Sequence, residues 1–506
     1  MDLLTVALLL FRFVSAVFSF EPLDITQDRT NKSAVWAVLV AGSCGFENYR
    51  HQADVLHAYH ILRERGVPSQ NIITMVCNDI ANDTNNPYEG MVFNEPNGPN
   101  LLEDAKMDYQ GKDVSPQTFM EIIWGNATGP VLNSTENDRV FIYYAGHGEN
   151  QTLSFQVDNP LDQLNANHIK ALFEFMYQKK MYKRLVFYVE ACHSGSLFSE
   201  DYAKDKNIYA VTAASAETTS FSANCIKLPD RGISSEYSEL CLGDEFSSNW
   251  MAFAEEAEPT VNTLLDQYQF SRKNTLRSQV QQFGDTSFVQ EPIGYYQGNI
   301  MAKEAEGFKD DKVKTFLEVG ERETEVIPVR KSSKKMRPTL GRKGAVKKIK
   351  GFIYSDEKPI TRKPAKFVPK KLLNKKFGSY PVRDMAIMQL KNKVDNTKNA
   401  TVKAMLQYKL DTMKRNRELA DAHMKDIFEK LDNLQNDKTK EVKAEWPCRT
   451  KVIQQFTRHC YKLSRDRYVA KYTGKLYSYC DRHYKQEEIE KVLEGNCQKR
   501  FAKQVV

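Results

Sequence analysis

Three features are missing or scarce in this 506-residue sequence. Beyond residue 20, no segment approaches the run of about 20 apolar residues that a membrane-spanning helix needs, so we expect a soluble mature protein. Cys44, His147 and Cys192 lack any spacing that would demand zinc, and we expect neither a metal nor another cofactor. Basic residues are scarce in positions 1–329, where 46 Asp and Glu outnumber 26 Lys and Arg. This part of the chain is therefore acidic.

The charge changes sign along the chain. Positions 1–329 carry a net charge of −20, positions 330–376 carry +16 and positions 377–506 carry +11, which gives +7 for the whole chain. Opposite signs within one chain predict that the acidic and basic parts attract each other. The alternative is that the basic part binds nucleic acid or a membrane surface. Because the chain has secretory features, we expect no nucleic-acid partner.

The chain begins with a stretch that is typical of a secretory signal peptide. Residues 3–20 are mostly apolar and end in small residues. Asp2 stands in place of the usual basic start and Arg12 interrupts the apolar stretch, so a signal anchor is the alternative. Asn-X-Ser/Thr triplets favour the secretory route, and their acceptors are Asn31, Asn82, Asn126, Asn133, Asn150 and Asn399.

A cysteine and a histidine each follow an apolar, β-rich run. Residues 184–196 read RLVFYVEACHSGS, in which a run long enough for a buried strand ends shortly before Cys192. Residues 139–148 read RVFIYYAGHG, in which a second such run is followed by His147 between two glycines. Open α/β folds bind ligands at the carboxyl edge of the sheet. We therefore interpret Cys192 as a nucleophile and His147 as its base, with a buried structural thiol as the alternative.

Strand and helix patterns alternate in the N-terminal part. Strands are expected at 36–40, 72–76, 139–144, 185–189 and 208–212, and helices at 51–65 and near 166–177. This alternation predicts an α/β fold with a parallel sheet that is covered by helices on both faces. Residues 329–379 are rich in Lys, Arg, Pro and Gly and predict a flexible linker. Apolar positions between 402 and 434 then have a helical spacing.

Four stretches together resemble the legumain family of asparaginyl endopeptidases. They are AGSCGFENYRHQADVLHAY from residue 41, AGHG from 145, YVEACHSGS from 188 and LGDEFSSNWM from 242. The resemblance implies a caspase-like α/β fold, with a mostly parallel sheet flanked by helices, and an all-α disulfide-bonded C-terminal prodomain. It also implies a cysteine endopeptidase zymogen that cleaves after Asn, or after Asp in acid, and activates itself in acid.

The resemblance extends to the catalytic residues. The family's third catalytic residue matches Asn48, whose amide would hold the ring of His147 in the useful tautomer. The alternative is that Asn48 only caps the following helix. The backbone N–H groups of Gly148 and Cys192 would donate to the oxyanion. A neighbouring imidazolium would lower the pKa of the Cys192 thiol from its usual ~8.5.

The family's charged specificity pocket can be matched residue by residue. The matching residues are Arg50, His51, Glu190, Ser220 and Asp244. A side-chain carboxamide has one acceptor oxygen and two donor hydrogens, so a cation and carboxylates together satisfy both ends. A substrate aspartate would be repelled unless it is protonated, at a pH near ~3.9. Cleavage after Asp is therefore expected only in acid.

The nine cysteines fall into groups. Four of them lie in the last ~60 residues, a density typical of an oxidised secreted module, and four cysteines allow three pairings. The resemblance implies Cys448 with Cys480 and Cys460 with Cys497, and it implies that Cys225 and Cys241 staple the loop between them. The remaining cysteines, Cys44, Cys77 and Cys192, are expected to stay free.

Two positions depart from the family. Cys44 lies where the family usually has asparagine, and we expect a buried thiol there, with a redox or metal role as the alternative. Gly146 precedes His147 where animal legumains carry aspartate, which removes a carboxylate beside the catalytic pair. This change puts fine pH tuning in doubt rather than proteolysis.

The resemblance also sets the expected organisation and partners. The expected segments are a signal peptide over 1–19, a propeptide over 20–33, a peptidase domain over 34–328, a basic linker and activation segment over 329–400 and a helical prodomain over 401–506. Expected partners are protein and peptide substrates, the chain's own prodomain as inhibitor and cystatin-type inhibitors. The expected location is the secretory pathway, with the lysosome, vacuole or exterior as destination.

Two alternatives remain open on the sequence. The same thioester chemistry would serve a transpeptidase or peptide ligase, in which an amine replaces water. A catalytically silent homologue is a third interpretation, which the presence of Asn48, His147 and Cys192 disfavours. Self-cleavage in the zymogen is expected near Asn392, Asn396 or Asn399.

Overall fold

The computed structural model describes most of the chain. The described residues are 33–155, 163–199, 201–228, 237–299, 379–434, 446–461, 463, 467–481 and 484–497. We call the described residues up to 299 the N-terminal part and those from 379 onward the C-terminal part. The expected signal peptide and most of the basic linker lie outside the described residues. Within the described residues, no helix is long and apolar enough to cross a membrane.

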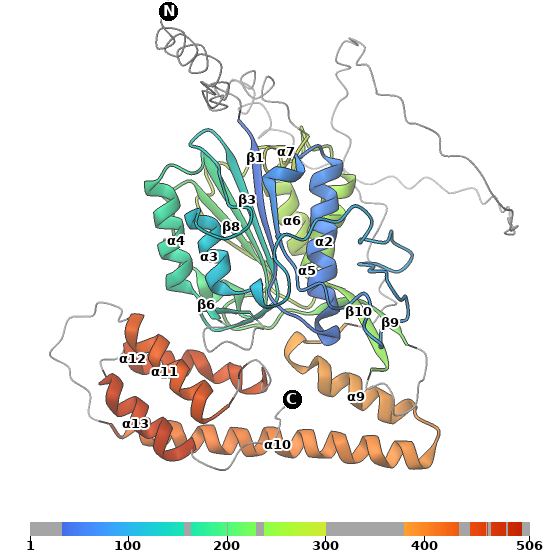
Figure 1. Ribbon diagram of the computed structural model, residues 1–506, viewed down its shortest axis with the longest axis vertical. Helices are drawn as coiled ribbons and strands as arrows, with labels where there is room; N and C mark the ends of the chain where they lie inside the picture. The colour runs from blue at the N-terminus through green and yellow to red at the C-terminus, as the bar shows by residue number, and fades with distance from the viewer. Residues whose placement is uncertain are drawn as a thin grey trace, which may run out of the picture. The chain divides into compact units, whose positions relative to one another are not determined.

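A six-stranded sheet forms the centre of the N-terminal part (Figure 1). Its order is β11-β8-β7-β3-β1-β2. All neighbours pair in parallel except β11 with β8, which is antiparallel. The strands are β1 Val35–Ala41, β2 Ile72–Met75, β3 Arg139–Ala145, β7 Arg184–Glu190, β8 Ile208–Thr212 and β11 Gln281–Gly284. The predicted mostly parallel sheet is confirmed.

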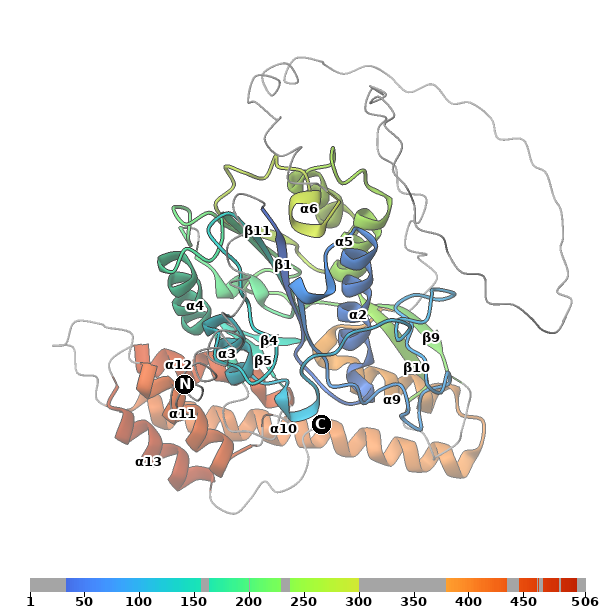
Figure 2. The ribbon, with the colours of Figure 1, turned by 45° about the horizontal axis from the view of Figure 1, so that its top comes forward.

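Helices cover both faces of this sheet, as Figures 1 and 2 show. On one face, α3 (Pro116–Trp124) and α4 (Ala166–Gln178) join a core cluster with alternate residues of β1, β3 and β7. On the other face lie α2 (Tyr49–Glu64), α5 (Glu245–Glu256) and α6 (Leu264–Asn274). There, Trp250 of α5 makes edge contacts with the rings of Tyr143 and Tyr188. Both faces are therefore buried, as the continuous apolar runs predict.

The register of the sheet aligns the two motifs that the sequence singles out. β3 pairs with β7 without a bulge, from Arg139 opposite Arg184 to Ala145 opposite Glu190. His147 and Cys192 each lie two residues beyond that last pair. The structure therefore brings both residues to the same edge of the sheet.

Smaller strands extend this edge. The segment after β3 forms a three-stranded sheet from β4 (His147–Glu149), β5 (Thr152–Ser154) and β6 (Gln163–Asn165). A separate antiparallel hairpin pairs β9 (Ser222–Lys227) with β10 (Glu239–Asp244), which leads directly into α5. A four-residue helix, α7 (Gly294–Gln297), closes the N-terminal part.

The C-terminal part is all helical, as expected. It comprises α9 Met385–Asn396, α10 Ala400–Asp432, α11 Trp446–His459, α12 Thr473–Asp481 and α13 Gln486–Cys497. The end of α10 packs with α11, α12 and α13 around a core of aromatic and aliphatic residues. Met405, which fits the helical spacing, is 54% exposed and does not belong to this core. Sequence reasoning missed α9, which lies in the expected linker.

Four disulfides occur among the described residues. Three join Cys225 to Cys241, Cys448 to Cys480 and Cys460 to Cys497, which are the pairs that the resemblance implies. The fourth joins Cys44 to Cys77, so the expectation of two free thiols there was wrong. Cys44 follows β1 and Cys77 follows β2, and these strands are parallel neighbours whose ends meet. Cys192 is the one free cysteine of the described residues.

Candidate active site

The loop that carries His147 lies directly against the main chain at Cys192. The amide of Gly146 donates to the carbonyl of Glu190 at 3.0 Å. A Cβ atom added at Gly148 would lie 2.5 Å from the carbonyl oxygen of Cys192, so only glycine allows this approach. The Cys192 side chain is buried, with 3% exposure. The two motifs therefore meet, as the sequence predicts.

Asn48 orients the histidine ring. Its side-chain nitrogen donates to the carbonyl of Cys44, so its oxygen is left to face Nε2 of His147 at 2.8 Å. An oxygen can only accept, so Nε2 carries the proton and Nδ1 is the basic nitrogen of the neutral ring. Asn48 does occupy the N-cap position of α2, but its side chain makes no capping bond. The side chain of Asn48 therefore bonds His147 and Cys44 and does not cap the helix.

Ser220 contacts the thiol of Cys192. Its amide lies 3.4 Å from the sulfur and its hydroxyl 3.6 Å. Burial raises the pKa of the Cys192 thiol, and the charge of Arg383 and the bonds from Ser220 only partly oppose this. The thiol of this precursor is therefore held neutral, in contrast to the lowered pKa that the sequence suggested.

The departure at Gly146 has a structural reason. The hydroxyl of Tyr144 donates to the carbonyls of His147 and Ser154, at 3.0 and 2.6 Å. A Cβ added at Gly146 would lie only 2.4 Å from that hydroxyl oxygen. Tyr144 therefore occupies the space that an aspartate side chain would need.

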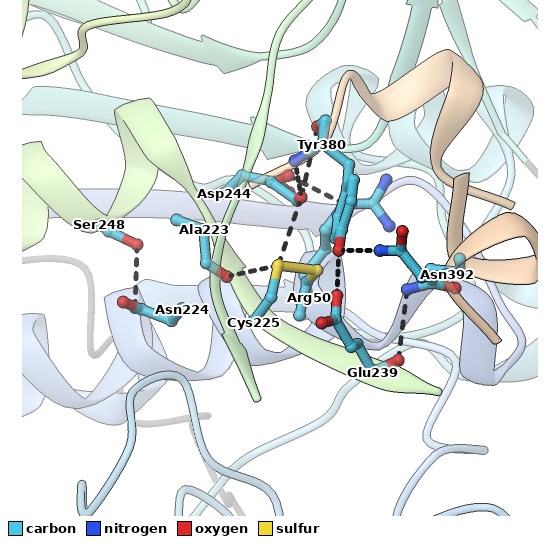
Figure 3. The surroundings of a disulfide bond; sticks show 12 residues. Arg50, Ala223, Asn224, Cys225, Glu239, Asp244, Ser248, Tyr380 and Asn392 are labelled. Carbon is cyan, nitrogen blue, oxygen red and sulfur yellow. Dashed lines mark hydrogen bonds and ion pairs between the residues drawn. A yellow bond between two sulfur atoms is a disulfide. The ribbon is translucent and has the colours of Figure 1, made fainter. Parts of the chain in front are cut away.

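The expected pocket residues Arg50, Glu190 and Asp244 are each at most 1% exposed. Nε of Arg50 donates to Asp244 at 2.8 Å, and Nη1 donates to the carbonyl of Glu47 at 3.0 Å. One oxygen of Glu190 accepts from the amide and hydroxyl of Ser247, at 2.9 and 3.0 Å. Figure 3 shows Arg50 and Asp244 beside the Cys225–Cys241 disulfide. The three charged groups thus come from α2, β7 and β10.

His51 completes this group. Its Nδ1 bonds the hydroxyl of Ser43, and its Nε2 lies 3.5 Å from Asp244. Its ring also contacts the ring of His147 edge-on, with centroids 4.9 Å apart. The pocket residues are thereby linked to the candidate catalytic pair.

Sequence reasoning missed a third buried carboxylate, Asp54. It accepts the amide of Asp244 at 3.2 Å. Burial, reinforced by Asp244 and Glu190, raises the pKa of Asp54 well above its usual value. Burial, reinforced by Asp244, does the same to Glu190. Asp54 follows Arg50 by four residues, which is about one turn of α2. Residues at this spacing lie on the same side of a helix, so the sequence could have indicated that Asp54 lies near the pocket.

A C-terminal arginine reaches the candidate catalytic residues. Arg383 donates to Glu149 at 2.6 Å and to Nε2 of His193 at 2.9 Å. Nδ1 of His193 faces the carbonyl of Ala216 at 2.8 Å, so the neutral ring donates there and accepts from Arg383. Glu149 and His193 directly follow the His147 and Cys192 motifs. Arg383 therefore covers this edge, and nothing in the sequence singled it out.

Further C-terminal contacts surround this arginine. Tyr380 exchanges main-chain and side-chain hydrogen bonds with Ser222 of β9, and its hydroxyl bonds Glu239 of β10. Asn392 of α9 donates to the same hydroxyl at 2.6 Å (Figure 3). At the other end, Tyr477 of α12 donates to Gln163 at 2.7 Å. The C-terminal part thus contacts both sides of the edge that carries Cys192.

These observations define a class of protein. A buried thiol and an oriented imidazole lie at the same carboxyl edge of a caspase-like sheet. Arg383, from the C-terminal part of the same chain, bonds Glu149 and His193 beside them. The protein is a cysteine endopeptidase with its own prodomain.

Comparison with known proteins gives the family. Residues 35–299 match the peptidase C13 family, and residues 408–497 match the legumain prodomain. The chain is 32% identical over 482 residues to the hemoglobinase of Schistosoma mansoni, which covers 95% of this chain and 94% of that protein. It is 39% identical over 270 residues to the legumain of Mus musculus. That alignment covers 52% of this chain and 59% of the mouse protein. The chain belongs to the peptidase C13, or legumain, family.

Proposed function

We propose that this protein cleaves peptide bonds after asparagine. The observation that supports this specificity is a pair of buried polar atoms of opposite kind in the pocket. Nη2 of Arg50 and Oε1 of Glu190 are both buried, and neither makes a hydrogen bond within the described residues. Buried polar groups without partners are costly, so a ligand that supplies both kinds of partner is favoured. A carboxamide does this with its oxygen and its NH₂ group.

The proposed chemistry follows from the orientation of His147. Its Nδ1 takes the proton of the Cys192 thiol, and the sulfur attacks the carbonyl carbon of the residue before the scissile bond. The N–H groups of Gly148 and Cys192 stabilise the oxyanion. The amine leaves with the proton from His147, and water then hydrolyses the thioester. Asn48 keeps the ring in place, and Ser220 and His51 line the site.

The specificity is tested with peptides that differ only in the residue before the scissile bond. Acid-treated protein is incubated with fluorogenic peptides that carry Asn, Gln, Asp or Ala at this position, and Cys192→Ala is the control. We expect the rate of cleavage after Asn to exceed the rate after Gln by about 10- to 200-fold. One extra methylene in the substrate has an effect of this size in a fitted pocket. Equal cleavage after Ala and Asn would contradict the proposal. Joined product exceeding hydrolysed product in the presence of an added amine would favour the transpeptidase instead.

We also propose that acid loosens the C-terminal part and permits self-cleavage. Burial raises the pKa of Glu149 to about 7, although the charge and hydrogen bond of Arg383 pull it down. Because Arg383 lowers this pKa, the arginine binds the carboxylate more strongly than the neutral acid. Its contribution to docking is therefore present above pH 7 and is lost as the pH falls through about 7. Burial acts the other way and outweighs the arginine, since the net pKa of Glu149 is raised. The proposed loosening therefore depends on the loss of attraction between the acidic N-terminal and basic C-terminal parts as carboxylates are protonated, and not on Glu149 by itself.

Self-cleavage after Asn392, Asn396 or Asn399 would make the release permanent. The first two lie within α9, and Asn399 caps α10 through bonds from the amides of Thr401 and Val402. We therefore propose that α9 must detach and unwind before it is cut. Mass spectrometry of the fragments formed at pH 5 measures which site is used.

The proposed setting is the secretory pathway, with the lysosome, the vacuole or the exterior as destination. The four disulfides of the described residues support an oxidising compartment. Cystatin-type proteins are the proposed inhibitors in trans. The sequon at Asn150 lies against α12, where a Cβ added at Gly474 would be 2.7 Å from the Cβ of Asn150. We therefore expect a glycan at Asn150 to be absent from the precursor, which glycopeptide mapping measures.

A further inference from the structure

The turn after β1 supports the side chain that orients His147. The side-chain nitrogen of Asn48 donates to the carbonyl of Cys44 at 2.5 Å, and the Asn48 amide donates to the carbonyl of Gly45 at 3.0 Å. The first of these bonds leaves the side-chain oxygen of Asn48 for Nε2 of His147. The position of the Cys44 carbonyl therefore sets the position of the group that holds the ring of His147.

The sulfur of the same cysteine is bonded to a second turn, which is anchored in the core. Cys44 forms its disulfide with Cys77, two residues beyond β2. The amide of Val76 donates to the carbonyl of Tyr109 at 3.0 Å, and the amide of Gly111 donates to the carbonyl of Cys77 at 3.3 Å. Cys77 is 6% exposed and packs in the core cluster on this face of the sheet. The disulfide therefore joins the turn after β1 to a well-packed part of the fold.

Hydrogen bonds join the same two turns at neighbouring positions. The carboxylate of Asp79 accepts from the amide of Gly45 at 2.8 Å and from the side chain of Gln52 at 2.7 Å. The amide of Asn78 donates to the oxygen of that Gln52 side chain at 3.0 Å. These bonds act on Gly45 and Gln52, whereas the disulfide acts on the residue whose carbonyl orients the amide of Asn48.

We propose that the Cys44–Cys77 disulfide is a positioning element, which holds the side chain of Asn48 in the arrangement that catalysis needs. The disulfide does not take part in the chemistry, so its effect passes through Asn48. A catalytic group has to be held to within about 0.5 Å by its surroundings, and a covalent link restricts a turn more than hydrogen bonds do. This inference rests on the role of Asn48 in the proposed function.

The same disulfide makes catalysis sensitive to reduction. Cys44 is half-buried, which gives a small dithiol a route to this bond. One thiolate of the dithiol attacks a sulfur of the disulfide, the bond between the two cysteine sulfurs breaks, and a mixed disulfide forms. The second thiol of the reductant then displaces the protein sulfur. Two cysteine thiols result, and the dithiol is oxidised to its own cyclic disulfide.

The first test separates positioning from stability by measuring kcat and KM. Cys44→Ser with Cys77→Ser removes the disulfide, and the acid-activated protein is assayed with the peptide of the Asn, Gln, Asp and Ala panel that wild type cleaves fastest. We expect kcat to fall about 10-fold, because a displacement of about 1 Å can cost up to about 100-fold. KM is expected to stay within about twofold, since the bond from Arg50 to Asp244 does not involve this disulfide. Thermal unfolding verifies the fold.

The variant Asn48→Ala shows whether the disulfide acts through this side chain. Asn48→Ala is prepared with the disulfide intact and with both cysteines replaced by serine. The two proteins are expected to have the same kcat within about twofold, because residues that act as one unit have non-additive effects. A disulfide that only stabilises the fold would lower kcat in this background as much as in wild type.

Reduction of the wild type is an independent measurement. Activated wild type is incubated with increasing concentrations of a dithiol, and alkylation with mass spectrometry measures the fraction of molecules in which the Cys44–Cys77 bond is open. We expect kcat to fall in proportion to this fraction. The double serine variant is the control, because effects of the dithiol on Cys192 or on the Cys225–Cys241 bond are the same in both proteins.

Each outcome bears on one proposal. A folded double serine variant with the kcat of wild type would overturn this inference, and so would a further 10-fold loss in the Asn48→Ala background. If the double variant does not fold, reduced wild type decides: unchanged kcat, or unfolding as this bond opens, would overturn the inference. Wild type that shows no preference for Asn would instead overturn the proposed specificity, and this test would proceed with the peptide that is cleaved fastest.

Discussion

The N-terminal and C-terminal parts are stabilised in different ways. The central strands of the N-terminal part are almost completely buried, and most residues of β1, β3 and β7 have exposures near zero. The C-terminal part has a smaller core, and it contains two of the four disulfides of the described residues, as many as the larger N-terminal part. Small cores depend more on such cross-links, because they bury less apolar surface per residue. We infer that the N-terminal part is the stable platform and that the C-terminal part is the easier of the two to unfold.

Individual hydrogen bonds join the N-terminal and C-terminal parts. They include bonds made by Arg383, Tyr380 and Tyr477. An apolar contact is also present, in which Met385 and Tyr380 pack with the Cys225–Cys241 pair. Among these contacts, the bond from Arg383 to Glu149 involves a carboxylate whose pKa is raised to about 7, so its strength depends on protonation. This contact is the one through which the proposed action of acid on the C-terminal part is tested below.

The largest effect is expected from variants that remove a catalytic side chain and leave both parts folded. Cys192→Ala is expected to reduce peptide cleavage by at least about 10³-fold, because loss of a nucleophile removes the covalent step. His147→Ala is expected to have a similar effect. Stopped assays with an Asn-ended peptide measure the rates, and circular dichroism verifies the fold. Residual activity within 10-fold of wild type would contradict the assignment.

Removing one disulfide from each part compares their stabilities. Cys44–Cys77 and Cys448–Cys480 span 33 and 32 residues, so the chain-entropy cost of losing either is similar, about 3.5 kcal/mol. We expect Cys448→Ser with Cys480→Ser to release the C-terminal part, and Cys44→Ser with Cys77→Ser to leave the N-terminal part folded. Differential scanning calorimetry measures both pairs. An equal decrease in the unfolding temperatures of the two parts would show that the N-terminal part is not the more stable one.

The glycine before the catalytic histidine offers a third test. Gly146→Asp is expected to destabilise the N-terminal part by about 1–3 kcal/mol, because the new side chain overlaps the hydroxyl of Tyr144. The paired variant Gly146→Asp with Tyr144→Phe removes that oxygen and is expected to recover part of the loss. Urea unfolding measures both. A single Gly146→Asp variant as stable as wild type would contradict the proposed steric reason.

The smallest expected effect concerns the contact at Arg383. Arg383→Gln is expected to weaken binding of the C-terminal part by about 10-fold at pH 8, the size of a charge-assisted hydrogen bond. Since this contribution is lost as the pH falls through about 7, variant and wild type are expected to converge at pH 5. The inhibition constant of the separately added C-terminal fragment measures this. Lys391→Gln, at the exposed Lys391–Asp395 pair, is the control.

Much of the fold could be read from local sequence. Each predicted strand appears within a residue or two of its expected bounds, because a continuous apolar run has one stable place in a parallel sheet. The placement of His147 and Cys192 at one edge followed, because both residues come after strands and the carboxyl ends of parallel strands lie at the same edge of a sheet. The strand order itself was not visible, and so the Cys44–Cys77 bond was missed. Arg383 and Glu149 are 234 residues apart, and no local pattern connects them.

The most direct test of the central claim is the ratio of kcat/KM for an Asn-ended and an Ala-ended peptide, measured with acid-activated wild type and Arg50→Lys. The claim is that a carboxamide pocket lies beside the Cys192 and His147 pair. It predicts strong preference for Asn in wild type and a loss of at least about 10-fold in that preference in the variant, because lysine cannot reproduce the fork of the guanidinium. A wild-type enzyme that cleaves both peptides equally well would contradict it.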